Sequence, residues 1–125
     1  MNDTRRIILA VTGATGMLYV EPLLNLLAAE GVAVHGVISD SGRQVLRLEL
    51  GRKPEDLPHV ERWFACDDFT APMASGSSLY DAMIVLPCTT GTLGAIAAGY
   101  SGNLIHRAAD VCLKERRPLI LAVRE

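Results

Sequence analysis

The sequence has few cysteines and no long apolar run. Its three cysteines, Cys66, Cys88 and Cys112, are widely separated, with no CxxC pair and no Cys/His spacing of a zinc site. This pattern excludes a disulfide framework and a zinc ribbon and favours a reducing compartment, so we expect a cytoplasmic protein without a metal site. No apolar segment reaches the ~20 residues that a membrane helix needs, so we expect no role in a membrane.

An excess of charge of one sign is also missing. The chain has 12 Lys and Arg against 14 Asp and Glu, a net charge of −2, and no run of like charge is longer than a pair. This balance excludes the basic surface that nucleic acids or anionic membranes attract, so a small molecule is the expected partner. The 125 residues, half of them apolar, are enough for one globular domain with a real core, which we assign to residues 1–125.

What the sequence does contain is a glycine turn between a strand and a helix, in residues 7–19 (IILAVTGATGMLY). The apolar run at its start is typical of a strand buried on both faces. Gly13 and Gly16 carry no Cβ, so the backbone can turn tightly and a ligand can approach it closely. We expect the free N–H groups of the helix that begins near Gly16 to face a crevice, where they suit a phosphate.

Apolar periodicity in the rest of the chain predicts alternating strands and helices. Pro22 is tolerated best in a first turn, so the regular part of the first helix begins later than Gly16 or bends near it. Parallel crossovers of this kind predict an open, doubly wound α/β sheet. The expected strands are 7–12, 32–38, 82–86 and 119–123, with 63–66 as a weak edge strand, and the expected helices are 17–30, 43–50, 93–98 and 104–114.

The loops that follow the strands should form one site, because ligands of such sheets bind outside the carboxyl ends of the strands. These loops are rich in hydroxyl groups and glycine and include one arginine, Arg124. Such groups supply N–H and O–H donors for a phosphate and a guanidinium fork for a phosphate or a polar ring edge. The loops comprise residues 13–16, 39–41, 88–92 and 124–125.

Each of these features also has a purely structural interpretation. The glycine turn can be only a tight connection, and Ser39 and residues 89–92 can be helix caps. Arg124 can be a solvated residue, and Glu49 can be an exposed charge on a short helix. A dinucleotide is a further alternative, because TGATG is similar to the TGxxG turn of short-chain dehydrogenases. However, Tyr19 takes the place of the third glycine and no Tyr-x-x-x-Lys pair follows, so a mononucleotide fits better and an NADPH-dependent reductase fits less well.

Taken together, the motifs resemble those of the UbiX-type flavin prenyltransferases, a branch of the flavoproteins that include peptidyl-cysteine decarboxylases. The resemblance covers essentially the whole chain. It implies a flavodoxin-like (Rossmann-like) three-layer α/β/α sandwich that binds FMN and forms a homo-oligomer of trimers grouped into a dodecamer. The motifs that carry it are VTGATGMLY, VISDSGRQVLRLE, ASGS at 74–77, LPCTTGTL and NLIHRAADVCLKERRPLILAVRE.

The activity implied by the resemblance is a metal-independent prenyl transfer. A dimethylallyl group passes from dimethylallyl phosphate to N5 and C6 of reduced FMN, and the prenylated FMN serves as the cofactor of a UbiD-type decarboxylase. Such a transfer needs stabilisation of the leaving phosphate, a hydroxyl near the flavin edge and a pocket that keeps water away from an allyl cation. Two alternatives stay open, a non-catalytic FMN-binding or assembly module and, less well supported, the NADPH-dependent reductase.

The resemblance also implies a role for single residues. Thr15 stands where the family has a serine near flavin N5, and Glu49 matches an active-site glutamate. Gly91 departs from the lysine or asparagine usual in the third loop, and threonine replaces serine at positions 15 and 89. The family also continues beyond position 125, so we expect a flavoprotein domain that is truncated at its C-terminus. The implied FMN-binding residues are Gly13, Ala14, Thr15, Ser39, Thr89, Thr90, Gly91, Thr92 and Arg124.

Overall fold

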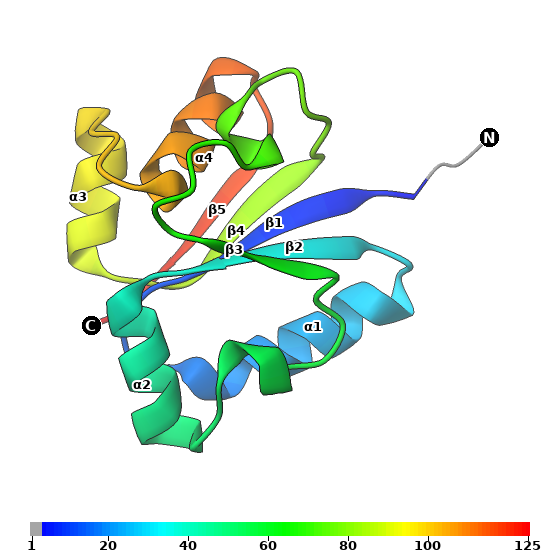
Figure 1. The fold of residues 1–125 in the computed structure, drawn as a ribbon, viewed down its shortest axis with the longest axis vertical. Helices are drawn as coiled ribbons and strands as arrows, with labels where there is room; N and C mark the ends of the chain where they lie inside the picture. Colours follow the sequence, from blue (N-terminus) through cyan, green and yellow to red (C-terminus); the bar gives the residue numbers. More distant parts are fainter. Residues whose placement is uncertain (1–3) are drawn as a thin grey trace.

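The computed structural model describes residues 4–125 as one parallel sheet of five strands between two layers of helices (Figure 1). The strand order is β3-β2-β1-β4-β5, and every neighbouring pair is parallel. This arrangement confirms the expected open α/β sheet, with β3 as the edge strand that the sequence only weakly indicated. The strands are β1 (Arg6–Val11), β2 (Ala33–Ile38), β3 (Arg62–Ala65), β4 (Ala82–Cys88) and β5 (Leu119–Val123).

The helices cover both faces of the sheet and complete the expected three-layer sandwich. Figure 1 shows α1 and α2 on one face and α3 and α4 on the other. Among the described residues, none of the helices combines the length and the apolar character needed to cross a membrane. The helices are α1 (Val20–Ala29), α2 (Asp40–Leu50), α3 (Thr90–Ala98) and α4 (Leu104–Lys114), with short 3₁₀ turns η1 (Met17–Tyr19), η2 (Pro54–Asp56) and η3 (Pro72–Ala74).

Each face of the sheet has its own core, because neighbouring residues of a strand point to opposite faces. In β1, Ile8 packs with the α3 and α4 side, whereas Leu9 packs with the α1 and α2 side. Both are almost fully buried, as expected for the strand at the centre of the sheet. β5 is the outer strand on one side, and its Ile120 is 55% exposed.

Two helices begin earlier than the apolar pattern predicts. The sequence predicted α2 from position 43 and α3 from position 93, but they start at Asp40 and Thr90. Their first turns contain few apolar residues and are held by caps: the side chains of Ser39 and Thr89 each accept a hydrogen bond from the third helical N–H. α1 begins later than Gly16, at Val20, as Pro22 suggested.

The order of the strands places the switch point of the sheet between β1 and β4. Connections leave β1 toward one face and β4 toward the other, and ligands of such sheets bind at this edge. We refer to the region bounded by the loops after β1 and β4 as the crevice. The C-terminal end of the chain lies at this same edge, near the beginnings of α2 and α3 (Figure 1).

Candidate functional site

The ends of β1 and β4 are joined at the switch point by the side chain of Thr12. Its Oγ1 donates to the carbonyl oxygen of Pro87 at 2.7 Å and accepts from the N–H of Thr89 at 2.9 Å. Thr12 is only 2% exposed. The buried hydroxyl of Thr12 therefore connects the starts of the two loops, after β1 and after β4, that the sequence predicted to bind the same ligand. The sequence motifs did not indicate Thr12 as a site residue, although a polar residue at the end of an apolar strand is a recognisable signal.

Gly13 is needed for packing within the chain. A Cβ at this position would lie 2.6 Å from both Cβ and Oγ of Ser41, in the first turn of α2. The space at Gly13 is therefore filled by Ser41, and the close ligand approach expected from the missing Cβ is not available on that side. Gly16 has a φ of 104°, which favours glycine because side chains with a Cβ rarely adopt it.

The N–H groups at the start of η1 are not free, and in that respect the expectation was wrong. The N–H groups of Gly16 and Met17 both donate to Oε1 of Glu49, at 3.2 and 3.0 Å. The N–H of Ala14 donates to the carbonyl oxygen of Thr12 at 2.9 Å. The carboxylate of Glu49 thus occupies the anion position at this turn. Although its side chain is exposed, Glu49 therefore has a specific structural contact.

The C-terminal residues lie against the first turn. The N–H and Oγ1 of Thr15 both donate to the carbonyl oxygen of Glu125, at 3.2 and 2.6 Å. The guanidinium carbon of Arg124 lies 5.7 Å from the centre of the Tyr19 ring. A Cβ at Gly16 would come within 3.0 Å of Cδ of Arg124. The side chain of Arg124 therefore crosses the turn, and its place is set by Gly16 and Tyr19.

The third loop forms the first turn of α3. Oγ1 of Thr89 accepts from the N–H of Thr92 at 3.0 Å and donates to Oγ1 of Thr92 at 2.8 Å, so both side chains serve the helix cap. The N–H groups of Thr90 and Gly91 belong to the first turn, where a helix offers no internal acceptor. The nearest atom to a Cβ at Gly91 would be 4.0 Å away, so the backbone there is open to approach. The thiol of the neighbouring Cys88 is buried, which raises its pKa and suits a packing role.

The second loop contributes Ser39 and Ser41. Ser39 caps α2 through the N–H of Gly42 at 3.0 Å, and its Oγ lies 3.2 Å from Oγ of Ser41. Ser41 connects this loop to the first turn at Gly13. The structure thus brings all of the predicted loops to one edge. Ser39 also lines a cavity of about 320 Å³, together with Ile38, Asp40, Arg43, Ala65, Cys66, Asp67, Gly102 and Asn103.

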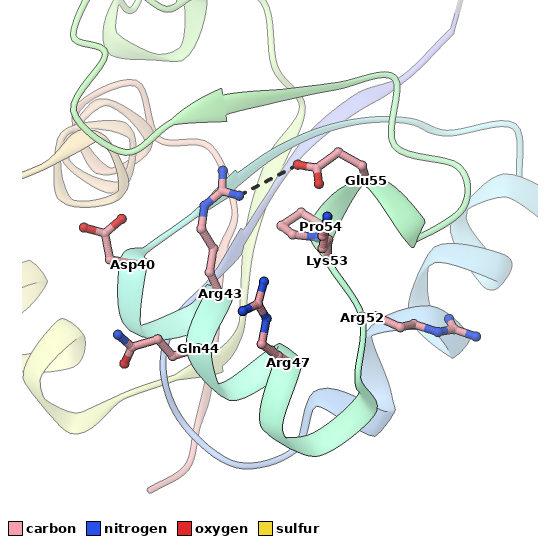
Figure 2. Close-up of a pocket in the computed structure, with 8 residues that line it drawn as sticks. All are labelled: Asp40, Arg43, Gln44, Arg47, Arg52, Lys53, Pro54 and Glu55. Carbon is pink, nitrogen blue, oxygen red and sulfur yellow. Dashed lines mark ion pairs between the residues drawn. The ribbon is translucent and has the colours of Figure 1, made fainter.

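A second cavity, of about 350 Å³, lies between α2 and η2 and contains none of the predicted site residues (Figure 2). Figure 2 shows Arg43 reaching toward Glu55, with which it forms an ion pair at 3.8 Å, whereas Arg52 points away and pairs with Glu21. The remaining cations, Arg47 and Lys53, are exposed, so this cavity is a surface groove bordered mainly by charged side chains. Its lining residues are Asp40, Arg43, Gln44, Arg47, Arg52, Lys53, Pro54 and Glu55.

A cluster around His35 lies elsewhere in the sheet. Nδ1 of His35 is 2.7 Å from the hydroxyl of Tyr80, and Nε2 is 3.3 Å from a carboxylate oxygen of Glu61. Burial lowers the pKa of His35, and the charges of Arg6 and Arg62 lower it further, against the opposing effect of Glu61. His35 therefore favours its neutral form in the folded protein, where it supports packing between β2 and the segment before β4.

Comparison with known proteins shows extensive similarity along the chain. Residues 1–124 match the model of the family described as Flavoprotein. The flavin prenyltransferase UbiX of Methanothermobacter thermautotrophicus is 48% identical over 126 aligned residues, which cover 100% of this chain and 66% of that protein. The chain thus spans about two thirds of the length of the curated relatives that it matches.

Solved structures share the fold closely. The crystal structure of AnUbiX (PadA1) in complex with FMN and dimethylallyl pyrophosphate superposes with a TM-score of 0.93 at 40% identity and covers 98% of this chain and 65% of that chain. A dodecameric FMN-dependent UbiX-like decarboxylase from Escherichia coli O157:H7 gives a TM-score of 0.90 at 38% identity, covering 96% of this chain and 67% of that chain. At these identities, the similarity extends from the fold to the sequence of the chain as a whole.

Proposed function

Since this chain belongs to the flavoprotein family, in the branch of the UbiX-type flavin prenyltransferases, we propose that it takes part in flavin prenylation. In the proposed reaction, the C–O bond of dimethylallyl phosphate would break, inorganic phosphate would leave, and the dimethylallyl group would be transferred to N5 and C6 of reduced FMN. The observation that carries the proposal is the geometry of the crevice, where Arg124 crosses the first turn and the open first turn of α3 follows the neighbouring strand.

The residues of the crevice fit a flavin mononucleotide. The N–H groups of Thr90 and Gly91 are suited to a phosphate or a polar ring edge, because a helix N-terminus favours negative charge. The open space at Gly91 supports this role, since a ligand can reach the backbone there. The guanidinium of Arg124 adds a planar donor fork. The remaining proposed FMN-binding residues are Gly13, Ala14, Thr15, Ser39, Thr89 and Thr92.

Thr15 and Glu49 are the proposed catalytic residues. Reduced FMN, when bound, supplies the nucleophilic ring atoms that accept the prenyl group. The hydroxyl of Thr15 is exposed in the first turn and is oriented by the carbonyl oxygen of Glu125, which supports this role. The Glu49 carboxylate is held at the same turn by two N–H groups, where its charge can stabilise positive charge that develops on the allyl group. The proposed reaction needs no metal.

We also propose that the chain works as a homo-oligomer built from trimers, up to a dodecamer, in the cytoplasm. Exposed apolar side chains near α3, Leu93 and Tyr100, and near η1, Leu18 and Tyr19, support contacts with further copies. The three cysteines are free thiols, which supports a reducing compartment. The prenylated FMN would pass to a UbiD-type decarboxylase.

A non-catalytic FMN-binding or assembly module is the second candidate. It is favoured by the bonds within the chain: the Thr15 hydroxyl is bonded to Glu125 and the Glu49 carboxylate to the first turn, whereas the α3 N–H groups stay open. Such an arrangement can hold FMN without transferring a prenyl group to it. An NADPH-dependent reductase is a weaker third candidate.

The deciding experiment is an FMN titration followed by flavin fluorescence, with NADPH titrated in parallel. Stoichiometric quenching by FMN, together with a prenylated flavin after addition of dimethylallyl phosphate to the reduced complex, supports the prenyltransferase. Binding without a product supports the module. Preferential binding of NADPH supports the reductase and contradicts the FMN site.

A further inference from the structure

We propose that Thr12 is a positioning residue of the crevice, whose buried hydroxyl orients the first turn of α3 relative to the first turn after β1. The inference rests on the proposed function and adds a residue outside the proposed FMN contacts. Thr12 occupies the point where the two loops separate: it directly follows β1, and both hydrogen-bond partners of its hydroxyl belong to the end of β4 and the loop after it.

The hydroxyl of Thr12 both donates and accepts a hydrogen bond. It has one proton, which it donates to the carbonyl oxygen of Pro87 at 2.7 Å, and a lone pair that accepts the N–H of Thr89 at 2.9 Å. Because Thr12 is 2% exposed, water cannot easily replace either bond. The N–H of Thr89 is partly buried, and an N–H that loses its acceptor in such a place is costly, so this arrangement is preferred over a shifted loop.

The bond to Thr89 continues into α3. Thr89 is the N-cap residue, and its Oγ1 accepts the N–H of Thr92 at 3.0 Å. A chain of hydrogen bonds thus runs from Thr12 through Thr89 to the first turn of the helix. It determines where the N–H groups of Thr90 and Gly91 point, and these are the groups that we assign to the ligand.

Removal of the Thr12 hydroxyl should affect the loop after β4 and leave the end of β4 in place. The carbonyl oxygen of Pro87 also accepts the N–H of Thr12 at 3.2 Å, so it keeps a donor in a valine variant. The N–H of Thr89 has the Thr12 hydroxyl as its partner and would lose it. The expected result is a displaced first turn of α3 on an otherwise intact sheet.

Three variants of the full chain test the inference. Thr12→Val removes the hydroxyl at nearly constant volume, and Thr12→Ser restores it. Ile8→Val is the matched control, because Ile8 is a fully buried residue of the same strand on the α3 and α4 side, away from the crevice loops. Three quantities are measured: the dissociation constant of FMN, the visible absorption of bound FMN, and the hydrogen exchange rate of the Thr89 amide by NMR.

We expect Thr12→Val to weaken FMN binding by about tenfold and to speed exchange of the Thr89 amide by about the same factor, as for the loss of one well-placed hydrogen bond. Thr12→Ser should return both quantities to within about threefold of the parent. Ile8→Val should lower the urea midpoint and leave FMN affinity, flavin absorption and Thr89 exchange unchanged.

The inference is overturned if Thr12→Val binds FMN with the parental affinity and spectrum, or if Ile8→Val weakens binding as much. The exchange rate separates this outcome from failure of the proposed function: if the parent does not bind FMN, a faster Thr89 amide in Thr12→Val still supports the positioning role. If Thr12→Val does not fold, the inference is tested by the amide exchange rates of the parent protein. A Thr89 amide that exchanges as fast as those of Thr90 and Gly91 contradicts the proposal.

Discussion

The carboxylate of Glu49 lies 3.0 Å from the backbone nitrogen of Met17, so the last turn of α2 holds the beginning of η1. The same Oε1 also accepts from the N–H of Gly16 at 3.2 Å. The negative charge lies where exposed N–H groups of a helical turn favour it. A residue far along the chain therefore fixes the turn that follows the central strand.

Glu49→Ala should lower the free energy of unfolding by about 1 kcal/mol, the value of bonds to a charged acceptor reduced by solvent exposure. Glu49→Gln keeps an oxygen acceptor and should lower the free energy of unfolding by less. Urea unfolding measures both. Glu55→Ala is the control, since Glu55 only forms the exposed pair with Arg43 at 3.8 Å, worth about 0.5 kcal/mol. Equal losses at positions 49 and 55 would count against a specific role for Glu49.

Gly13 and Gly91 should respond differently to a methyl group. Gly13→Ala places a Cβ 2.6 Å from Ser41 and should cost about 1–3 kcal/mol of stability, as overpacking does. Gly91→Ala meets open space in a helix and should change stability by at most about 1 kcal/mol, in the stabilising direction. Denaturant midpoints test this. Adding Ser41→Gly to Gly13→Ala removes the two side-chain contacts at 2.6 Å but leaves the backbone carbon of residue 41 at 3.0 Å, so it should recover part of the loss. A double variant no more stable than Gly13→Ala would contradict the assignment.

Arg124→Ala should weaken FMN binding by about tenfold or more, because the guanidinium fork at the first turn is removed. Tyr19→Ala should produce a smaller loss, since Arg124 then lacks the ring beside it, and Tyr19→Phe should retain the parental affinity. Fluorescence titrations measure these changes. Arg116→Ala makes the same change of charge outside the crevice and serves as control. Parental affinity in Arg124→Ala would remove this residue from the site.

The stability of the protein should fall as the pH falls through 6.5, in part because of His35. Its pKa in the folded protein is below the unfolded value of 6.5, chiefly through burial. The unfolded chain therefore takes up the proton first: the contribution of His35 is complete above pH 6.5 and is lost as the pH falls through 6.5 toward the folded pKa. Urea midpoints across this range should depend less on pH in His35→Gln.

His106 should also contribute to the pH dependence of stability and can be compared with His35. Burial also lowers the pKa of His106, so His106→Gln should remove a separate part of the same loss. The double variant should show the flattest profile. If His35→Gln has the parental pH profile, the environment assigned to His35 is wrong.

The parts of the fold with a clear apolar period could be predicted from the sequence. Helix α4 and strand β5 have the predicted bounds, because α4 alternates buried and exposed faces and Pro118 directly precedes β5. The starts of α2 and α3 could not be predicted from apolar residues, since their first turns are held by the hydroxyl groups of Ser39 and Thr89. At these ends, hydrogen bonding outweighs the hydrophobic pattern.

In the candidate site, the sequence indicated the loops but not their internal contacts. Residues such as Arg124 and Thr90 could be placed at one edge because parallel strands end together. The role of Glu49 in holding Gly16 depends on the packing of α2 against η1, which no local pattern contains. The contact of Gly13 with Ser41 is of the same kind. Long-range contacts, and not the types of residue, decide which N–H groups remain free for a ligand.

The outer position of β5 has a consequence for handling the protein. β5 (LILAV) contains neither proline nor charge, and within the described residues its outer edge has no neighbouring strand. An apolar strand with such an edge can template the addition of strands from other molecules, the first step of aggregation. Pro118 before β5 and Arg124 after it interrupt this tendency, as gatekeeper residues do. Loss of the arginine would therefore also lower the concentration at which the chain stays in solution.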